Sequence, residues 1–344
     1  MATTDDGTRT TFLGEVKSAV TPHASLLVLG VLGLVIAFIT SYTGAFHHPA
    51  PADVPLGVVA PAQAKAQLVG KLDRLPGSPL DPRALPSERA ARQQLADRTI
   101  DGALIVDPRG STDRLLVAGG GGASLAQAVE LVVRSAEKAQ HRTVRTVDVA
   151  PATAGDSRSL SSFYLVVGWC VGGYLCAAIL AISAGARPSN GHRAVIRLAA
   201  LAVYALAAGL AGAIIVGPVL GALPGTFLGL WGLGTLTVFA VGATTLACQA
   251  LLGILGIGLA ILLIVILGNP SAGGAYPYPL LPPFWRAIGP ALPPGAGTWT
   301  ARSLAYFRGH AITGPLLVLA AWAMGGTLLT LALSIFRKKG ENPS

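Results

Sequence analysis

The sequence predicts an α-helical polytopic membrane protein with six transmembrane helices and a small extracytoplasmic α/β domain inserted between helices 1 and 2. Of its 344 residues 52% are hydrophobic and only 12% are charged, whereas a soluble domain carries about 25% charged residues. Six apolar runs reach the length of about 20 residues that a helix needs to cross a bilayer. The one long polar stretch, 46–160, holds 12 of the 16 acidic residues.

The first apolar run, 24–45, is predicted to be a retained transmembrane helix. It is longer than the apolar core of a signal peptide, about 7–15 residues, and it follows an N-terminus with three acids and two bases. Residues 1–23 are predicted to be cytoplasmic. Within them Phe12, Leu13 and Val16 share one arc of a helical wheel, which indicates either an in-plane helix or a cytosolic extension of the first span.

The polar stretch 46–160 is long enough to hold a modest core and is predicted to fold as the α/β domain. Its apolar patterns predict strands and helices in alternation, listed here by their sequence: "PLGVVAP", "PAQAKAQLVGKL", "PSERAARQQLADR", "DGALIVD", "RLLVAG", "SLAQAVELVVRSAEKAQ" and "RTVRTVDVA". Ser124 with Gln127 suggests a capping box at the start of the sixth. The run "GGGGAS" at 119–124 lacks the residues of a phosphate loop and is predicted to be a turn.

The segment 161–336 is predicted to be a five-helix transmembrane domain. Its apolar runs lie at 162–184, 194–217, 225–247, 249–268 and 313–336. The fourth and fifth runs are separated only by an uncharged turn near "ACQALLG". Basic residues flank the link between the second and third runs and begin the tail 337–344, so both termini are predicted to be cytoplasmic.

Several functional classes are disfavoured by the residues present. No Asp or Glu occurs from Ser157 to Gly340, so a proton-coupled carrier lacks its usual intramembrane carboxylate. The chain contains no ATPase or other catalytic motif, so it is not expected to be an enzyme. The three cysteines lie in apolar runs, and neither a cofactor nor a metal is predicted. Basic residues mostly flank apolar runs, which disfavours nucleic acid as a partner.

The segment 269–312 interrupts the apolar sequence before the last run. It carries many prolines, two tryptophans and arginines at 286, 302 and 308. Broken backbone exposed to hydrocarbon leaves amide groups unpaired, so the segment must lie at the membrane interface or line a cavity.

This arrangement resembles the permeases of type-2 ABC transporters, and most closely the phage-infection-protein (YhgE/Pip)-like membrane proteins. The residues that carry the resemblance are "SERAARQQLADRTIDGALIVDP" at 87–108 and "GNPSAGGAYPYPLLPPFWRAIGPALPPGAGTWTARSLAYF" at 268–307. The resemblance implies a bacterial cell-membrane protein, a homodimer among membrane lipids, and a separate ATP-binding subunit where transport is energised. It also implies that 269–312 forms a re-entrant external gate.

The expected gate residues are Trp285, Arg286, Trp299, Arg302, Tyr306 and Phe307. The rings would lie at the level of the lipid head groups, and Arg286 and Arg302 would face head groups or an anionic cargo. In the alternative interpretation the segment is only an interfacial anchor. The expected cytoplasmic coupling loop contains Arg187, His192 and Arg193, and it is short for a loop that docks on an ATPase.

Two functional hypotheses follow. In the first, the chain is an exporter-type permease that moves hydrophobic or amphipathic compounds outward, energised by a separate ATPase if at all. In the second, it is a non-transporting surface protein whose external domain binds a partner, an envelope polymer or a phage. A neighbouring or copurifying ATPase would favour the first hypothesis.

Overall fold

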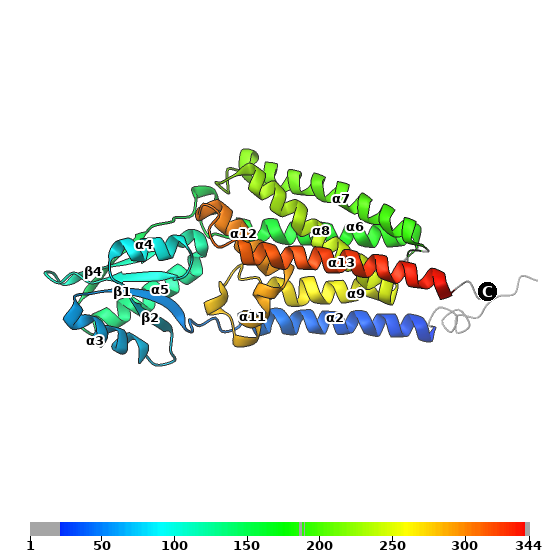
Figure 1. Cartoon of the computed structure of the whole chain (residues 1–344). Helices are drawn as coiled ribbons and strands as arrows, with labels where there is room; N and C mark the ends of the chain where they lie inside the picture. The colour runs from blue at the N-terminus through cyan, green and yellow to red at the C-terminus, as the bar shows by residue number, and fades with distance from the viewer. Residues whose placement is uncertain (1–20, 186–187, 189, 341–344) are drawn as a thin grey trace, which may run out of the picture.

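The computed structural model describes residues 21–185, 188 and 190–340. The predicted in-plane helix and the tail beyond residue 340 lie outside this range. The described chain forms a bundle of long helices with an α/β domain at one end (Figure 1).

Five helices in the described part of the chain are long and apolar enough to cross a membrane. They are α2 (Pro22–Phe46), α6 (Ser161–Ala184), α7 (Gly191–Ile214), α8 (Phe227–Leu252) and α13 (Thr313–Gly340). A π-helical turn, η3 (Ile215–Val219), continues α7 around Pro218. Five of the six predicted runs are therefore confirmed as long helices.

The fifth predicted run forms a shorter and broken helix. It consists of α9 (Leu255–Ile261), the π-helical turn η4 (Leu262–Gly268) and α10 (Asn269–Ser271). The uncharged turn predicted near "ACQALLG" is confirmed, because the chain reverses at Gly253, where φ is +64°. The fourth run was predicted to end too early, since α8 continues to Leu252. A side chain at Gly256 would lie 2.3 Å from the backbone of Cys248. Only glycine lets α9 fold back against α8 so closely.

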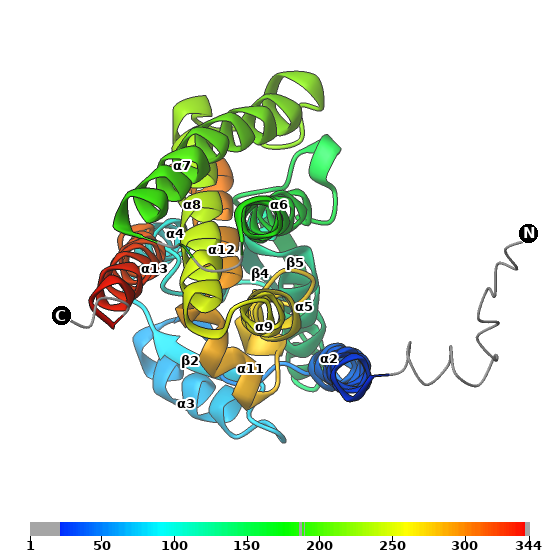
Figure 2. The same cartoon turned by 90° about the vertical axis from the view of Figure 1, so that its right-hand side faces the viewer.

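Helix α8 is the centre of the bundle. Its most apolar stretch is 72% buried, against 6% for α2 at the edge (Figure 2). Glycines bring the neighbouring helices into contact with it: Gly173 of α6 meets Val238, Gly209 of α7 meets Trp231 and Thr235, and Gly326 of α13 meets Ala243. Small residues of this kind allow helices to pack closely, and in a lipid environment such packing contacts drive helix association because the hydrophobic effect between helices is absent.

The α/β domain is built on a five-stranded sheet. Its elements are β1 (Val54–Val59), α3 (Ala62–Asp73), β2 (Leu80–Ala84), α4 (Glu88–Ala96), β3 (Gly102–Ile105), β4 (Thr112–Val117), α5 (Ala123–Lys138) and β5 (Thr143–Asp148). The strand order is β2-β1-β3-β4-β5, and all neighbours are parallel except β3 and β4. Apolar residues of α3 and α5 pack on one face of the sheet, and those of α4 pack on the other.

Two features of the domain differ from the sequence analysis. Strand β2, "LDPRA", was not predicted because it has little apolar content and contains Pro82, which is tolerated at the edge of a sheet. The capping box was also wrong. Helix α5 begins at Ala123 after the turn η1 (Gly119–Gly121), and Gly122 occupies the cap position. Ser124 therefore lies inside the helix, and its Oγ donates to the carbonyl of Ala275, 2.8 Å away.

Candidate functional site

The segment 269–312 is divided into short helices that lie between the α/β domain and the bundle (Figure 1). After α10 come η5 (Tyr278–Leu280), α11 (Pro283–Ile288), η6 (Gly289–Ala291) and α12 (Pro293–Tyr306). Proline stands in the first turn of each of these four elements. Because proline starts a helix but cannot continue one from the preceding residue, each proline marks a break.

Arg98, which follows α4, inserts its side chain into the surface of α12. Its guanidinium lies 3.5 Å from the ring centre of Trp299 and 4.7 Å from that of Phe307. Its Nη1 donates to the carbonyl of Trp299 at 3.0 Å and to Ser303 Oγ at 2.8 Å. Burial, together with the charge of Arg302, lowers the pKa of Arg98 to about 9. Sequence analysis missed this residue, because an arginine at a helix end is usually solvated.

Arg302 joins three segments of the backbone inside the protein instead of lying at the level of the lipid head groups, and this environment was not predicted. The side chain is buried, with 3% of the residue exposed. Its Nη1 donates to the carbonyl of Gly273 at 2.5 Å, and its Nη2 donates to those of Gly274 and Ser159 at 2.7 and 2.9 Å. The turn that contains Gly273, where φ is +70°, leaves these carbonyls without helical partners.

Tyr306 and Phe307 also contact the α/β domain, which corrects the expectation that their rings face the head groups. Tyr306 Oη donates to Asp156 Oδ2 at 2.6 Å, and its ring covers Gly120 so closely that a side chain there would lie 2.5 Å from the ring. Phe307 is 5% exposed and packs beside Gly121. The glycine run thus serves as the surface on which α12 docks.

The other predicted gate residues lie at the rim of the same junction. Trp285 is half-buried, and its Nε1 lies 4.0 Å from the position of a Cβ at Gly44 of α2. Arg286 Nη1 donates to the carbonyl of Ala52 at 2.9 Å, and its Nη2 lies 3.3 Å from Asp53 Oδ2. Trp299 Nε1 donates to the carbonyl of Ala311 at 2.9 Å. All six predicted residues are therefore brought to one region, mostly by contacts within the protein.

The predicted coupling loop lies at the opposite end of the bundle (Figure 1). His192 and Arg193 are exposed in the first turn of α7, and Asn190 Oδ1 caps this helix by accepting from the backbone N–H of Arg193 at 2.9 Å. Arg187 lies outside the described residues.

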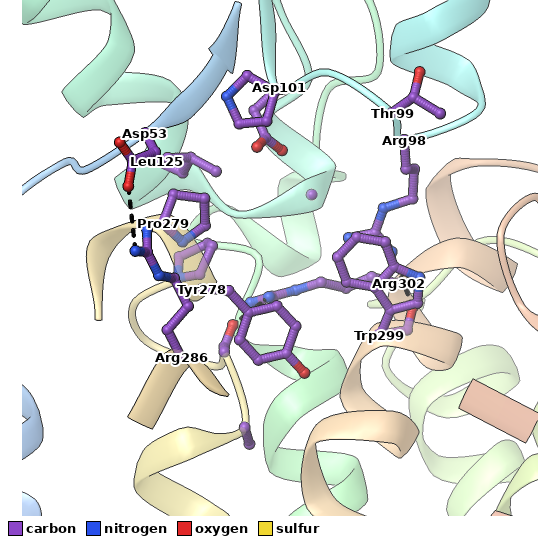
Figure 3. A pocket seen from close by; sticks show the side chains of 15 residues that line it. Asp53, Arg98, Thr99, Asp101, Leu125, Tyr278, Pro279, Arg286, Trp299 and Arg302 are labelled. Atoms are coloured by element: carbon purple, nitrogen blue, oxygen red, sulfur yellow. Dashed lines mark hydrogen bonds and ion pairs between the residues drawn. The ribbon is translucent and has the colours of Figure 1, made fainter. Parts of the chain in front are cut away.

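A cavity of about 400 Å³ lies between the α/β domain and the segment 269–312 (Figure 3). We call it the junction cavity. Its lining combines charged and aromatic side chains: Asp53, Arg98, Asp101, Tyr278, Arg286, Trp299 and Arg302. Asp101 points toward the open centre, and burial raises its pKa to about 6 against the opposing charge of Arg98. Sequence analysis did not single out Asp101.

Two further hollows lie beside α13. The domain-side hollow, about 470 Å³, is lined by Tyr278, Pro290, Ala296, Trp299, Ala311, Thr313, Gly314 and Pro315. The mid-bundle hollow, about 460 Å³, is lined by Thr244, Ala247, Cys248, Leu263, Ala321, Trp322, Gly325, Gly326 and Leu329. Both linings are almost entirely apolar.

Comparison of the chain with protein-family models, with curated proteins and with solved structures finds no match. The function must therefore be argued from the geometry of the site itself.

Proposed function

We propose that this chain is an exporter-type membrane permease that moves amphipathic compounds outward, energised by a separate ATPase subunit where energy is required. In this proposal the five long helices and the apolar segment 255–271 make six spans. Both termini are cytoplasmic, and the α/β domain is outside, in a bacterial cell membrane. The chain acts as a homodimer and has no cofactor or catalytic activity of its own.

The observation that carries the proposal is the row of three cavities from the bundle to the domain. The α13 residues that line the two hollows, apart from Thr313, fall within an arc of about 140° on a helix of 3.6 residues per turn. One side of α13 is therefore hollowed at two levels. The bond from Trp322 Nε1 to the carbonyl of Ala291, 2.8 Å long, joins the lining of the mid-bundle hollow to the residue that follows Pro290 of the domain-side hollow.

The chemistry changes along this row in the way an amphipathic compound requires. The two hollows beside α13 are apolar, whereas the junction cavity contains three arginines and two aspartates. Tyr278 and Trp299 line both the junction cavity and the domain-side hollow, and their rings are stacked at 6.1 Å. A compound with an apolar chain and a polar end would find an apolar surface first and charged groups last.

The docking of the α/β domain also favours transport over the surface-receptor hypothesis. Arg98, Ser124 and Asp156 each form a hydrogen bond to the segment 269–312. A domain that only captured a partner would not need so many contacts with the part of the chain that closes the cavities.

Two glycines allow the proposal to be tested without disturbing the fold. A Cβ at Gly314, which lines the domain-side hollow, or at Gly325, which lines the mid-bundle hollow, would have no neighbour within 4 Å. Gly314→Leu and Gly325→Leu should therefore fill the hollows while the protein reaches the membrane at normal abundance. We expect both to raise the accumulation of fluorescent amphipathic dyes in cells to the level of a strain lacking the protein.

The matched control is Gly33→Leu, since Gly33 of α2 also has no neighbour within 4 Å but lines neither hollow. It should leave dye accumulation at the wild-type level. Normal export by both hollow-filling variants would contradict the proposal. Unchanged dye levels in the strain lacking the protein, with capture of an envelope polymer by the α/β domain, would support the surface-protein hypothesis instead.

A further inference from the structure

The charges that line the junction cavity are not balanced. Arg286 is paired with Asp53, but Arg98 and Arg302 form no ion pair with any described residue. The charge of Asp156 favours the protonated form of Arg302, but Asp156 does not line the cavity. Its carboxylate accepts hydrogen bonds from Tyr306 Oη and from the backbone N–H of Ser161. Three arginines against two aspartates leave the lining with a formal charge of +1.

Arg302, which lines the cavity, also carries a donor without an acceptor. Both Nη atoms of Arg302 are engaged by carbonyls, but its Nε is buried and has no hydrogen-bond partner within the described structure. Buried donors are normally paired, so an unpaired one in a cavity indicates where an acceptor from outside the chain can bind. A carboxylate or a phosphate supplies this acceptor and the missing negative charge together.

Asp101 decides when such an anion can enter. Its carboxyl group makes no hydrogen bond or ion pair with the described residues and points into the cavity (Figure 3). As a carboxylate it repels an anion, and as a neutral acid it donates a hydrogen bond to one. The charges that act on it come from Arg98 and Arg83, while Arg286, Arg302 and Asp53 share the cavity.

The junction cavity adjoins the domain-side hollow, because two residues line both spaces. Tyr278 and Trp299 form a wall common to the cavity and the domain-side hollow. A head group in the cavity would therefore place its chain across these two rings, in a hollow that offers only apolar contacts. Neither space alone provides for both halves of an amphipathic molecule.

We infer that the junction cavity binds the anionic head group, a carboxylate or a phosphate, of a single-chain amphipathic molecule whose chain occupies the domain-side hollow. The inference rests on the proposed function insofar as this molecule is the exported compound, but the binding itself is measured without transport. A cationic amphipath is disfavoured because the lining contains three arginines, whereas Asp101 is the one carboxyl group among the described lining residues without an ion-pair partner.

The test uses the full-length protein in lipid nanodiscs made of zwitterionic lipid, with four probes. Dodecyl phosphate and dodecanoate share an anionic head and a chain, dodecyltrimethylammonium reverses the charge, and inorganic phosphate lacks the chain. We expect the two anionic amphipaths to bind and to bind more tightly as the pH falls through about 6. The cationic amphipath and inorganic phosphate should bind at least tenfold more weakly.

Two variants make the result specific to Asp101. Asp101→Asn removes the repelling charge and keeps a hydrogen-bond donor, so at pH 7.5 it should strengthen dodecyl phosphate binding about tenfold. Only the pH dependence that comes from the second ionisation of the phosphate itself, at about pH 6, should remain. The control Asp73→Asn removes an exposed acid of the same domain and should change neither the affinity for dodecyl phosphate nor its pH dependence. Since Asp101→Asn is expected to strengthen binding, loss of the fold cannot imitate the predicted result.

Other outcomes separate this inference from the proposed function. Preference for the cationic amphipath, weakened by Asp101→Asn, would overturn it, and so would equal binding of inorganic phosphate, which would make the site one for a free anion. Dye export that is blocked by Gly325→Leu, with no binding of any anionic probe, would overturn the inference alone. Binding as expected, with no export of any compound, would support the inference and overturn the transport function.

Discussion

Replacing Arg98 by alanine removes a side chain by which the α/β domain contacts α12. The wild-type guanidinium makes two hydrogen bonds, of 3.0 and 2.8 Å, and lies over two aromatic rings. A hydrogen bond from a charged group contributes about 1.5–3 kcal/mol. A cation–π contact contributes about 0.5–2 kcal/mol, depending on how far it is desolvated.

The net effect is smaller than the sum of these contributions. Burying Arg98 costs free energy, as its lowered pKa shows, and part of the hydrogen-bonding energy is recovered when water reaches Ser303 in the variant. Contacts shared by one guanidinium are also not additive. We therefore expect Arg98→Ala to weaken docking of the domain by about 2–3 kcal/mol, which is roughly a 30- to 150-fold increase in the open population.

The measurement is amide hydrogen exchange of the purified full-length protein in nanodiscs. Exchange in α12 and in the glycine run 119–122 should accelerate by this factor, while exchange in the α/β sheet stays unchanged. Arg98→Lys keeps the charge but not the planar guanidinium, so its exchange rate in α12 should lie between those of the wild type and Arg98→Ala.

The control is Arg92→Ala, which removes the 2.9 Å ion pair between Arg92 and Glu88 on the surface of α4, the helix that precedes Arg98. Exposed pairs of this kind contribute about 0–1 kcal/mol, so exchange in α12 should hardly change. If Arg98→Ala also left exchange in α12 unchanged, Arg98 would not hold the domain to the bundle, and the assignment of the junction as a docked interface would be refuted.

Three more predictions concern other parts of the molecule. Burial and the neighbouring Asp113 raise the pKa of Glu137 from 4.5 to about 7, so the folded domain loses stability as the pH rises between these values. Glu137→Gln should therefore stabilise the protein by about 1–2 kcal/mol at pH 8, and its thermal unfolding temperature should decline less between pH 4.5 and 7. Gly256→Val should destabilise the bundle by about 1–3 kcal/mol, because its Cβ would lie 2.3 Å from the backbone of Cys248. The control Gly258→Val should unfold at the wild-type temperature, because its Cβ would have its nearest neighbour at 3.8 Å. Cysteines introduced at Ser78 and Ser344 should differ in intact cells, with only the first labelled by an impermeant thiol reagent; equal labelling would contradict the proposed topology.

Within the segment 269–312, sequence analysis predicted the correct region but only part of its chemistry. The density of proline indicated short broken helices, and this is what the structure contains. The roles of Arg302, Tyr306 and Phe307 could not be predicted, because each depends on a partner elsewhere in the chain, such as Ser159 for Arg302. An arginine in a membrane protein is more often solvated at the interface than bound to backbone carbonyls, so composition favoured the wrong environment.

What the sequence determined by itself are the properties that depend on neighbouring residues: the long apolar helices, the polar α/β insert between the first two, and the helix breaks at proline. These follow from local hydropathy, periodicity and backbone restriction, which act over a few turns of chain. Only the tertiary structure decided where Arg98 and Asp101 lie. Arg98 and Trp299 are 201 positions apart in the sequence. Their contact exists only once the sheet of the α/β domain and the helix bundle have both formed and packed against each other. The junction cavity belongs to this second class because its walls come from segments that no local rule brings together.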